Sequence, residues 1–285
     1  MMKEEFIEFL KQKKKIVDEE LDRILERIKT SPIYPAISYS IKSGGKRLRP
    51  VLLMASYSSF SEENEKKTLP FAVGIELIHT YSLIHDDLPA MDNADTRRGK
   101  PSLHKVFGED LAILSGDALL TLAFEVMSSV DTIKPELTLK CINEVAKNAG
   151  IEGMVGGQVM DVMTSPDETN EELIYYIHSK KTGALIKTAL KIGVILAERG
   201  EKEISVIEKF GEKVGLSYQI LDDIEDARKG TEDEDRLTFP KMFGIEKSKE
   251  IASNLLNEAQ DVLKELSLKN NILFSFVEYL KSWLS

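Results

Sequence analysis

Two clusters of aspartates follow apolar stretches of this sequence, at a spacing suited to a divalent cation. The clusters are Asp86, Asp87 and Asp92, and Asp222, Asp223 and Asp226. In a helix, Asp222 and Asp226 lie one turn apart on the same face, where like charges repel. A bound cation relieves this repulsion, and a ligand set made only of oxygen atoms favours magnesium. The alternative, acidic helix ends that face water, explains a single pair more easily than two clusters.

Two short basic segments complement the aspartates. The first follows the Gly44-Gly45 pair and contains Lys46, Arg47 and Arg49, and the second is the Arg97-Arg98 pair after the first aspartate cluster. An arginine binds a phosphate group through its planar fork of N–H donors. Either segment alone reads as a solvated surface. Beside carboxylates of the magnesium type, the two together predict a diphosphate site.

Composition excludes several other classes of function. Of 285 residues, 42% are hydrophobic and 30% are charged, as in an ordinary globular protein. The net charge of −10 argues against nucleic acid as a partner. The single cysteine, Cys141, excludes an internal disulfide and any site that needs several cysteines. With no apolar run of membrane-spanning length and no signal-peptide core near the N-terminus, the sequence predicts a cytoplasmic protein.

Helical spacing dominates the sequence, and the alternation typical of strands is nearly absent. We expect one all-α domain of about ten helices over residues 1–285, without an interdomain linker. The clearest helical patterns cover residues 17–28, 71–88, 111–130, 173–198, 204–227, 245–266 and 272–284. Thr182-Gly183 interrupts the fourth pattern, as a kink or as a junction of two helices. Further breaks are expected at Ser165-Pro166 and from Lys229 to Asp235.

In their order along the chain, these motifs resemble those of the trans-isoprenyl diphosphate synthases. The resemblance covers most of the chain and rests on GGKRLRP (44–50), ELIHTYSLIHDDLPAMD (76–92), RRGKP (97–101), GDALL (116–120), GGQ (156–158) with Asp161, KTGA (181–184) and GLSYQILDDIED (215–226). The inserted Pro89-Ala90 is similar to the bacterial farnesyl diphosphate synthase type, also called geranyltranstransferase. The resemblance implies an all-α bundle of the isoprenoid synthase type around a deep central cavity.

The resemblance also implies a role for each motif. The six aspartates would hold three magnesium ions on an allylic diphosphate, which Arg97 and Lys229 would also bind. Isopentenyl diphosphate would be bound by Gly45, Lys46, Arg49, His79 and Arg98. Lys181, Thr182 and Gln219 would line the reacting centre and contact the allylic diphosphate. Backbone carbonyls near Lys181, the Thr182 hydroxyl and the Gln219 amide oxygen would stabilise the carbocation that forms when the diphosphate leaves. No protein nucleophile is needed.

The segment after Asp226 departs from the family pattern because it is shorter than usual. Lys229 or Arg236 would therefore replace a lysine that binds the diphosphate, and the sequence leaves the choice open. Cys141, His104 and His178 read as packing or surface residues. The apolar faces of the stretch 111–130 predict a homodimer, as the family resemblance also implies.

Tyr81 bears on the length of the product. It lies five residues before Asp86, about 7.5 Å along a helix, where an aromatic ring could close the pocket behind a growing prenyl chain. The resemblance implies the same role. The sequence thus predicts farnesyl diphosphate, made from isopentenyl diphosphate with dimethylallyl and then geranyl diphosphate. Geranylgeranyl diphosphate synthesis and a non-catalytic partner subunit are the alternatives, whereas a terpene cyclase and a metal-dependent phosphohydrolase are disfavoured.

Overall fold

The computed structural model describes residues 2–165, 167–231 and 236–285. Over these residues the chain is helical apart from its loops and one two-stranded hairpin, which confirms the all-α prediction. The hairpin pairs β1 (Thr96–Arg97) with β2 (Lys100–Pro101) in antiparallel register. Pro166 and residues 232–235, parts of two expected breaks, lie outside the described residues. The fold is that of the all-α isoprenoid synthases.

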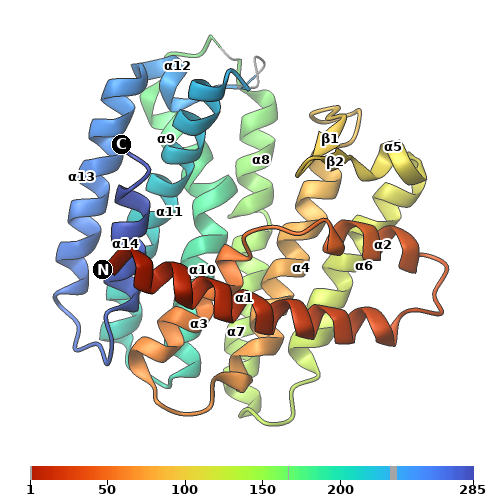
Figure 1. Ribbon diagram of the computed structural model, residues 1–285, viewed down its shortest axis with the longest axis horizontal. Coiled ribbons are helices and arrows are strands. Elements are labelled where there is room, and N and C mark those ends of the chain that lie inside the picture. The colour runs from red at the N-terminus through yellow and green to blue at the C-terminus, as the bar shows by residue number, and fades with distance from the viewer. Residues whose placement is uncertain (1, 166, 232–235) are drawn as a thin grey trace. The chain divides into compact units, whose positions relative to one another are not determined.

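One compact unit comprises residues 11–51 and 66–142. It contains most of α1 (Met2–Arg27), α2 (Tyr34–Lys42), the start of α3 (Leu48–Phe60), most of the 3-10 turn η1 (Glu65–Thr68), α4 (Leu69–Asp86), α5 (Leu103–Phe107), α6 (Glu109–Ser128) and the start of α7 (Pro135–Ala149). Helix α4 is buried along most of its length and packs beside α6 (Figure 1). The buried helix expected over 71–88 is therefore confirmed, with its last helical residue at Asp86.

Glycines allow α4 and α6 to approach closely. A Cβ atom on Gly74 would lie 2.7 Å from Cγ of Met127. Among the described residues, α6 is the one helix that is long and apolar enough to cross a membrane. It packs along α4, however, as a core helix of a folded unit does, so its composition is weak support for a membrane span. Its outer face leaves Ile113 and Leu114 exposed.

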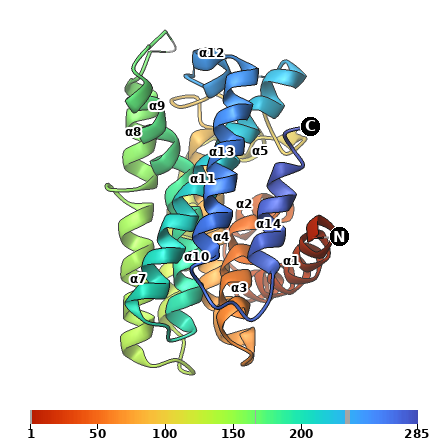
Figure 2. The same ribbon diagram turned by 90° about the vertical axis from the view of Figure 1, so that its left-hand side faces the viewer.

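The second unit comprises residues 2–10, 52–65 and the described residues from 143 onward. Its own helices are α8 (Met154–Met163), α9 (Glu171–His178), the π-helix η2 (Ser179–Gly183), α10 (Ala184–Leu196), α11 (Glu201–Lys229), α12 (Phe239–Phe243), α13 (Ile245–Leu263) and α14 (Ile272–Lys281). The long helix α11 packs against both α10 and α13, and Figure 2 shows the three running together. Near the two ends of the chain, the rings of Phe6 and Phe276 pack 4.9 Å apart. Whether the chain forms the expected single domain stays a prediction.

The break expected near Thr182-Gly183 is the π-helix η2, which joins α9 to α10. Neighbouring backbones approach it closely at glycines. A Cβ atom on Gly215 of α11 would lie 2.9 Å from Cα of Gly183, and one on Gly157 of α8 would collide with the backbone nitrogen of Lys181. Only hydrogen atoms fit at these positions, so both glycines are needed where α8 and α11 cross the π-helix.

We expect Gly215→Ala to destabilise the fold, although alanine is the better helix former. The new methyl group must push the backbone of η2 away, which should cost about 1–3 kcal/mol in the free energy of unfolding measured in urea. Ser205→Ala, on the exposed face of the same helix, is the matched control. It should stay within about 0.5 kcal/mol of the wild type. Equal stabilities of the two variants would contradict the close crossing.

Candidate active site

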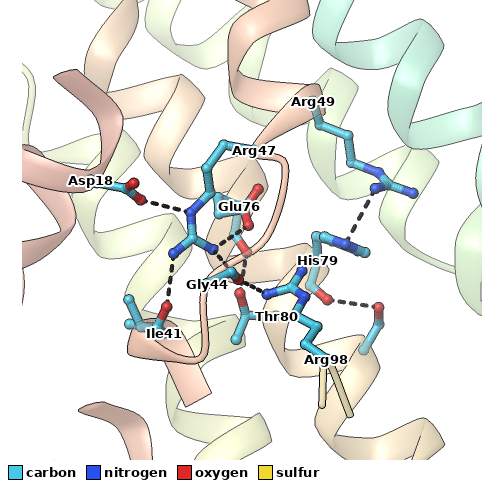
Figure 3. Close-up of polar contacts among 10 residues, drawn as sticks. Asp18, Ile41, Gly44, Arg47, Arg49, Glu76, His79, Thr80 and Arg98 are labelled. Atoms are coloured by element: carbon cyan, nitrogen blue, oxygen red, sulfur yellow. Dashed lines mark hydrogen bonds and ion pairs between the residues drawn. The ribbon is translucent and has the colours of Figure 1, made fainter. Parts of the chain in front are cut away.

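Three of the residues expected to bind isopentenyl diphosphate form a cationic cluster in the unit that contains α4 (Figure 3). Nη1 of Arg49 lies 3.3 Å from Nε2 of His79. The guanidinium group of Arg98 donates to the carbonyl oxygen of Gly44 and covers Gly45, where a Cβ atom would lie 2.7 Å from Arg98. Gly45 also has a φ of 135°. Glycine is therefore required at position 45 both for the backbone turn and for the arginine above it.

Burial, together with the charges of the cluster, keeps His79 neutral. The pKa of His79 lies well below its usual value, because burial disfavours the imidazolium and because Arg49, Arg98, Arg47 and Arg97 add positive charge nearby. A neutral histidine held among arginines leaves a net positive site, which suits an anion with several phosphate oxygens. Lys46 is exposed beside this site.

Arg47 has a structural role that the sequence analysis missed. Its side chain is 3% exposed and binds Glu76, 2% exposed on α4, at 2.7 Å. It also donates to Asp18 at 2.8 Å and to the carbonyl oxygen of Ile41 at 2.7 Å. Arg47 thus fixes the Gly44-Gly45 turn to α4 and leaves Arg49 in the cluster. The available signal was Glu76 itself, because an acid in a buried apolar run needs a cationic partner.

The first aspartate motif contains one buried carboxylate that is already paired. Asp87 is 4% exposed, and its Oδ1 accepts hydrogen bonds from Nε and Nη2 of Arg97 at 2.8 and 2.5 Å. Burial raises the pKa of Asp87, while the hydrogen bonds and charge of Arg97 oppose that rise. The backbone N–H of Asp92 donates to the carbonyl oxygen of Asp86 at 2.9 Å, which brings the two ends of the motif together. The structure therefore places Arg97 on Asp87.

The second motif repeats this arrangement in the other unit. Asp223 is 7% exposed and its Oδ2 lies 2.8 Å from Nε2 of His178. Nε2 of Gln219 donates to Oδ1 at 2.7 Å, and the backbone N–H of Phe239 donates to Oδ2 at 3.3 Å. Asp222 is less buried, and Asp226 is exposed. His178 was read as a packing or surface residue. Its position four residues before Thr182, one turn earlier in a helix, was the signal available for it.

The reacting-centre residues are held around the π-helix η2. Oγ1 of Thr182 donates to Oε1 of Gln219 at 2.6 Å, and Nζ of Lys181 lies 2.6 Å from Oδ2 of Asp161. The same oxygen of Asp161 is 3.7 Å from Nη1 of Arg236. The sequence analysis had assigned Asp161 to a motif without a role. Its place in that motif, ahead of the KTGA segment, was the only signal for the pairing with Lys181.

The structure separates the two candidates for the missing lysine. Arg236 lies beside Lys181 through their shared partner Asp161. Lys229 pairs instead with Glu225 one turn earlier on α11, at 2.5 Å, and its side chain is exposed. Of the two cations, Arg236 is therefore the one near the reacting-centre residues.

The donor chemistry of both motifs fits magnesium. Among the described residues, no three Asp, Glu, His or Cys side chains are arranged to hold a metal on their own. Magnesium binds through one or two carboxylates and takes its other ligands from water and substrate phosphates. Asp87 and Asp223 are the most buried aspartates of the two motifs and accept protein hydrogen bonds, so direct ligation suits the more exposed Asp86, Asp92, Asp222 and Asp226 better.

Tyr81 is 7% exposed on α4, and its ring stands edge-on to that of His85 with 5.8 Å between the centroids. Burial raises the pKa of Tyr81 to about 12, so the ring is a neutral phenol at any physiological pH.

Comparisons with a family model, with relatives of known sequence and with solved structures agree with one another. The family model described as polyprenyl synthetase matches residues 30–266. A heterodimeric geranylgeranyl pyrophosphate synthase large subunit from Arabidopsis thaliana is 41% identical over 91% of this chain and 74% of the relative. An FPP/GFPP synthase from Zymomonas mobilis has a TM-score of 0.82 at 35% identity, covering 96% of this chain and 97% of its own. A geranyltransferase from Legionella pneumophila has a TM-score of 0.87 at 31% identity, over 99% of both chains.

Replacing Arg47 with methionine should leave Glu76 buried without its cation and cost about 3–5 kcal/mol in the free energy of unfolding. Adding Glu76→Leu should recover most of that loss, because two apolar side chains replace the pair. Lys46→Met, at the exposed neighbour, should cost less than about 0.5 kcal/mol. Urea denaturation of the four proteins tests this, and an Arg47→Met variant as stable as Lys46→Met would refute the structural role.

Proposed function

The chain belongs to the polyprenyl synthetase family and is a prenyltransferase, and we propose that it synthesises short-chain prenyl diphosphates. In this proposal, one group of site residues binds isopentenyl diphosphate and another binds the allylic diphosphate. The observation that carries the proposal is the Arg49–His79–Arg98 cluster, a positive site in the same unit as the first aspartate motif. That combination suits two diphosphates handled in two ways, one bound by cations of the protein and one bound through magnesium.

In this proposal the cationic cluster, with Gly45 and Lys46, binds the diphosphate of isopentenyl diphosphate. Lys181 and Arg236 bind the allylic diphosphate, and the more exposed aspartates of each motif, Asp86 with Asp92 and Asp222 with Asp226, would hold magnesium. Magnesium, when bound, draws negative charge onto the departing diphosphate. Asp87 and Asp223 orient their neighbours rather than binding the metal directly. In these assignments, Arg236 takes the diphosphate-binding role that the sequence analysis gave to Lys229. Arg97 binds Asp87 instead of the allylic diphosphate.

The reaction then needs no covalent intermediate with the protein. The allylic C–O bond breaks, and its electron pair leaves with the diphosphate. The double bond of isopentenyl diphosphate attacks the carbocation, and a proton is lost to restore an alkene in the longer chain. Oxygen lone pairs near the π-helix, above all on Thr182, stabilise the positive charge. The departing diphosphate is the proposed acceptor of the proton.

Two product lengths are supported by different observations. Geranylgeranyl diphosphate is favoured by the relatives, since several plant proteins 39–42% identical to this chain carry that activity in their names. Farnesyl diphosphate, the product that the sequence analysis favoured, is supported by the buried ring of Tyr81 on α4. We take the geranylgeranyl product as the leading proposal and the farnesyl product as the second candidate.

We also propose an assembly and a location. A homodimer through α6 is supported by the exposed Ile113 and Leu114 on its outer face. Both aspartate motifs are complete, which argues against a non-catalytic partner subunit. A cytoplasmic location is proposed from the sequence alone, whereas the names of the plant relatives place those proteins in chloroplasts.

Magnesium dependence separates the two kinds of aspartate. Asp222→Asn should lower kcat by about 10²–10⁴-fold and raise the magnesium concentration that gives half the maximal rate, because a direct ligand is weakened. Asp223→Asn should lower kcat with little change in that concentration. Titration of magnesium against the rate of prenyl transfer measures both, with Glu201→Gln at the far end of α11 as the control. Full wild-type activity in excess chelator would contradict the metal assignment.

Tyr81→Ala should give longer products than the wild type, because removing the ring opens the pocket beside α4. Tyr81→Phe keeps the ring and should leave the product unchanged. The test is to incubate each protein with isopentenyl and dimethylallyl diphosphates plus magnesium and to separate the dephosphorylated products by chain length. A C20 product from the wild type supports the leading proposal, and a C15 product supports the second. Identical products from wild type and Tyr81→Ala would remove Tyr81 as the determinant of length.

A further inference from the structure

A continuous chain of hydrogen bonds, part-buried at Thr182 and buried at His178, runs from the reacting centre to His178. Thr182 donates to Gln219 at 2.6 Å, Gln219 donates to Asp223 at 2.7 Å, and Nε2 of His178 lies 2.8 Å from Asp223. All four residues belong to the unit that contains α9, η2 and α11. His178 is the last residue of α9, directly before η2, and Thr182 lies inside η2. The chain of bonds thus closes a ring around the irregular turn.

His178 is fixed tightly at its end of this ring. Its side chain is 5% exposed, and its ring stands edge-on to Phe239 with 5.1 Å between the centroids. Phe239 is fully buried, and its backbone N–H also donates to Asp223. Nδ1 of His178 has no hydrogen-bond partner among the described residues. The bond from Nε2 to Asp223 is therefore the polar link through which this histidine acts.

Each member of the chain fixes the direction of the next. An ionised carboxylate only accepts hydrogen bonds, so Nε2 of His178 must donate to Asp223. For the same reason the amide of Gln219 must turn its NH2 group toward Asp223 and its oxygen toward Thr182. Thr182 then gives its single hydrogen to that oxygen. Both lone pairs of the Thr182 hydroxyl remain available, and oxygen lone pairs stabilise a developing positive charge.

We propose that His178 is a positioning residue for prenyl transfer. Through Asp223 and Gln219 it sets the direction of the Thr182 hydroxyl toward the reacting allylic carbon, without touching the substrate itself. The inference rests on the proposed function of Thr182 at the reacting centre. It explains why a π-helix, whose hydrogen bonding is irregular, holds one geometry here: both of its ends are tied to the same carboxylate through side chains.

Three variants test the direction of the effect. His178→Phe keeps a ring against Phe239 but removes the donor, and it should lower kcat about 10²-fold while the KM for isopentenyl diphosphate stays unchanged. His178→Gln restores an N–H near the position of Nε2 and should return kcat to within about tenfold of the wild type. Ile177→Ala, at a buried neighbour outside the chain, should lower stability and leave kcat within about twofold.

A double-mutant cycle separates positioning from simple packing. If His178 acts through Gln219, His178→Phe should cost less than about threefold in kcat once Gln219→Ala is present. Losses that multiply fully would overturn the proposal, as would an Ile177→Ala variant that loses kcat as severely as His178→Phe.

A second readout does not depend on activity. In ¹⁵N-labelled protein without substrate, the side-chain NH2 signal of Gln219, assigned by its absence from Gln219→Ala, should shift in His178→Phe and return toward its original position in His178→Gln. An unchanged signal would overturn the proposal. A wild type that does not condense the two diphosphates would instead contradict the proposed function, and the NMR result would still decide whether the hydrogen-bond chain exists.

Discussion

Three buried carboxylates, and the donors that each of them requires, determine how the site residues of this chain are held. Glu76, Asp87 and Asp223 are 2–7% exposed, and each lies on or beside an otherwise apolar stretch of helix. An unpaired carboxylate at such depth would cost several kcal/mol. Each is therefore bound by a specific donor from elsewhere in its unit. Those donors come from the same short segments that carry the candidate chemistry.

A division of roles within the motifs follows from this constraint. In several motifs, one residue is buried and paired, while a near neighbour is the one that the proposed function assigns to a ligand. Arg47 is buried and Arg49 lies in the cationic cluster. Arg97 binds Asp87, and the adjacent Arg98 covers the glycine turn. Because the buried member fixes the backbone, it helps to hold the other member where the proposed function needs its side chain. In the Arg97-Arg98 pair, one arginine thus neutralises a buried carboxylate, and the other contributes positive charge to the cationic cluster.

The sequence was sufficient for the helical fold, but not for the pairings that the structure shows among the candidate site residues. Helical spacing identified α4 and α11 because each presents apolar residues in a regular pattern over several turns. The pairings were beyond the sequence because they join distant positions: Arg47 is 29 residues from Glu76, and His178 is 45 residues from Asp223. Nothing in the local sequence distinguishes the buried Arg47 from its exposed neighbour Lys46. Local sequence also does not distinguish Arg236 from Lys229, because Lys229 is the last residue of α11 and Arg236 follows a few residues later.

The residue proposed to limit product length makes a different kind of contact from the residues proposed to bind the diphosphates. Tyr81 lies on α4 between the cationic cluster and the first aspartate motif, yet its ring packs edge-on to His85 and its phenol is neutral. Glu76 and Asp87 are bound by arginines, whereas the contact of Tyr81 is with an aromatic ring. A change at Tyr81 would therefore alter the space available to an apolar chain without changing the charges that hold the diphosphates. If Tyr81 limits the product as proposed, chain length can vary within one catalytic framework, because an apolar surface would set it rather than the polar network.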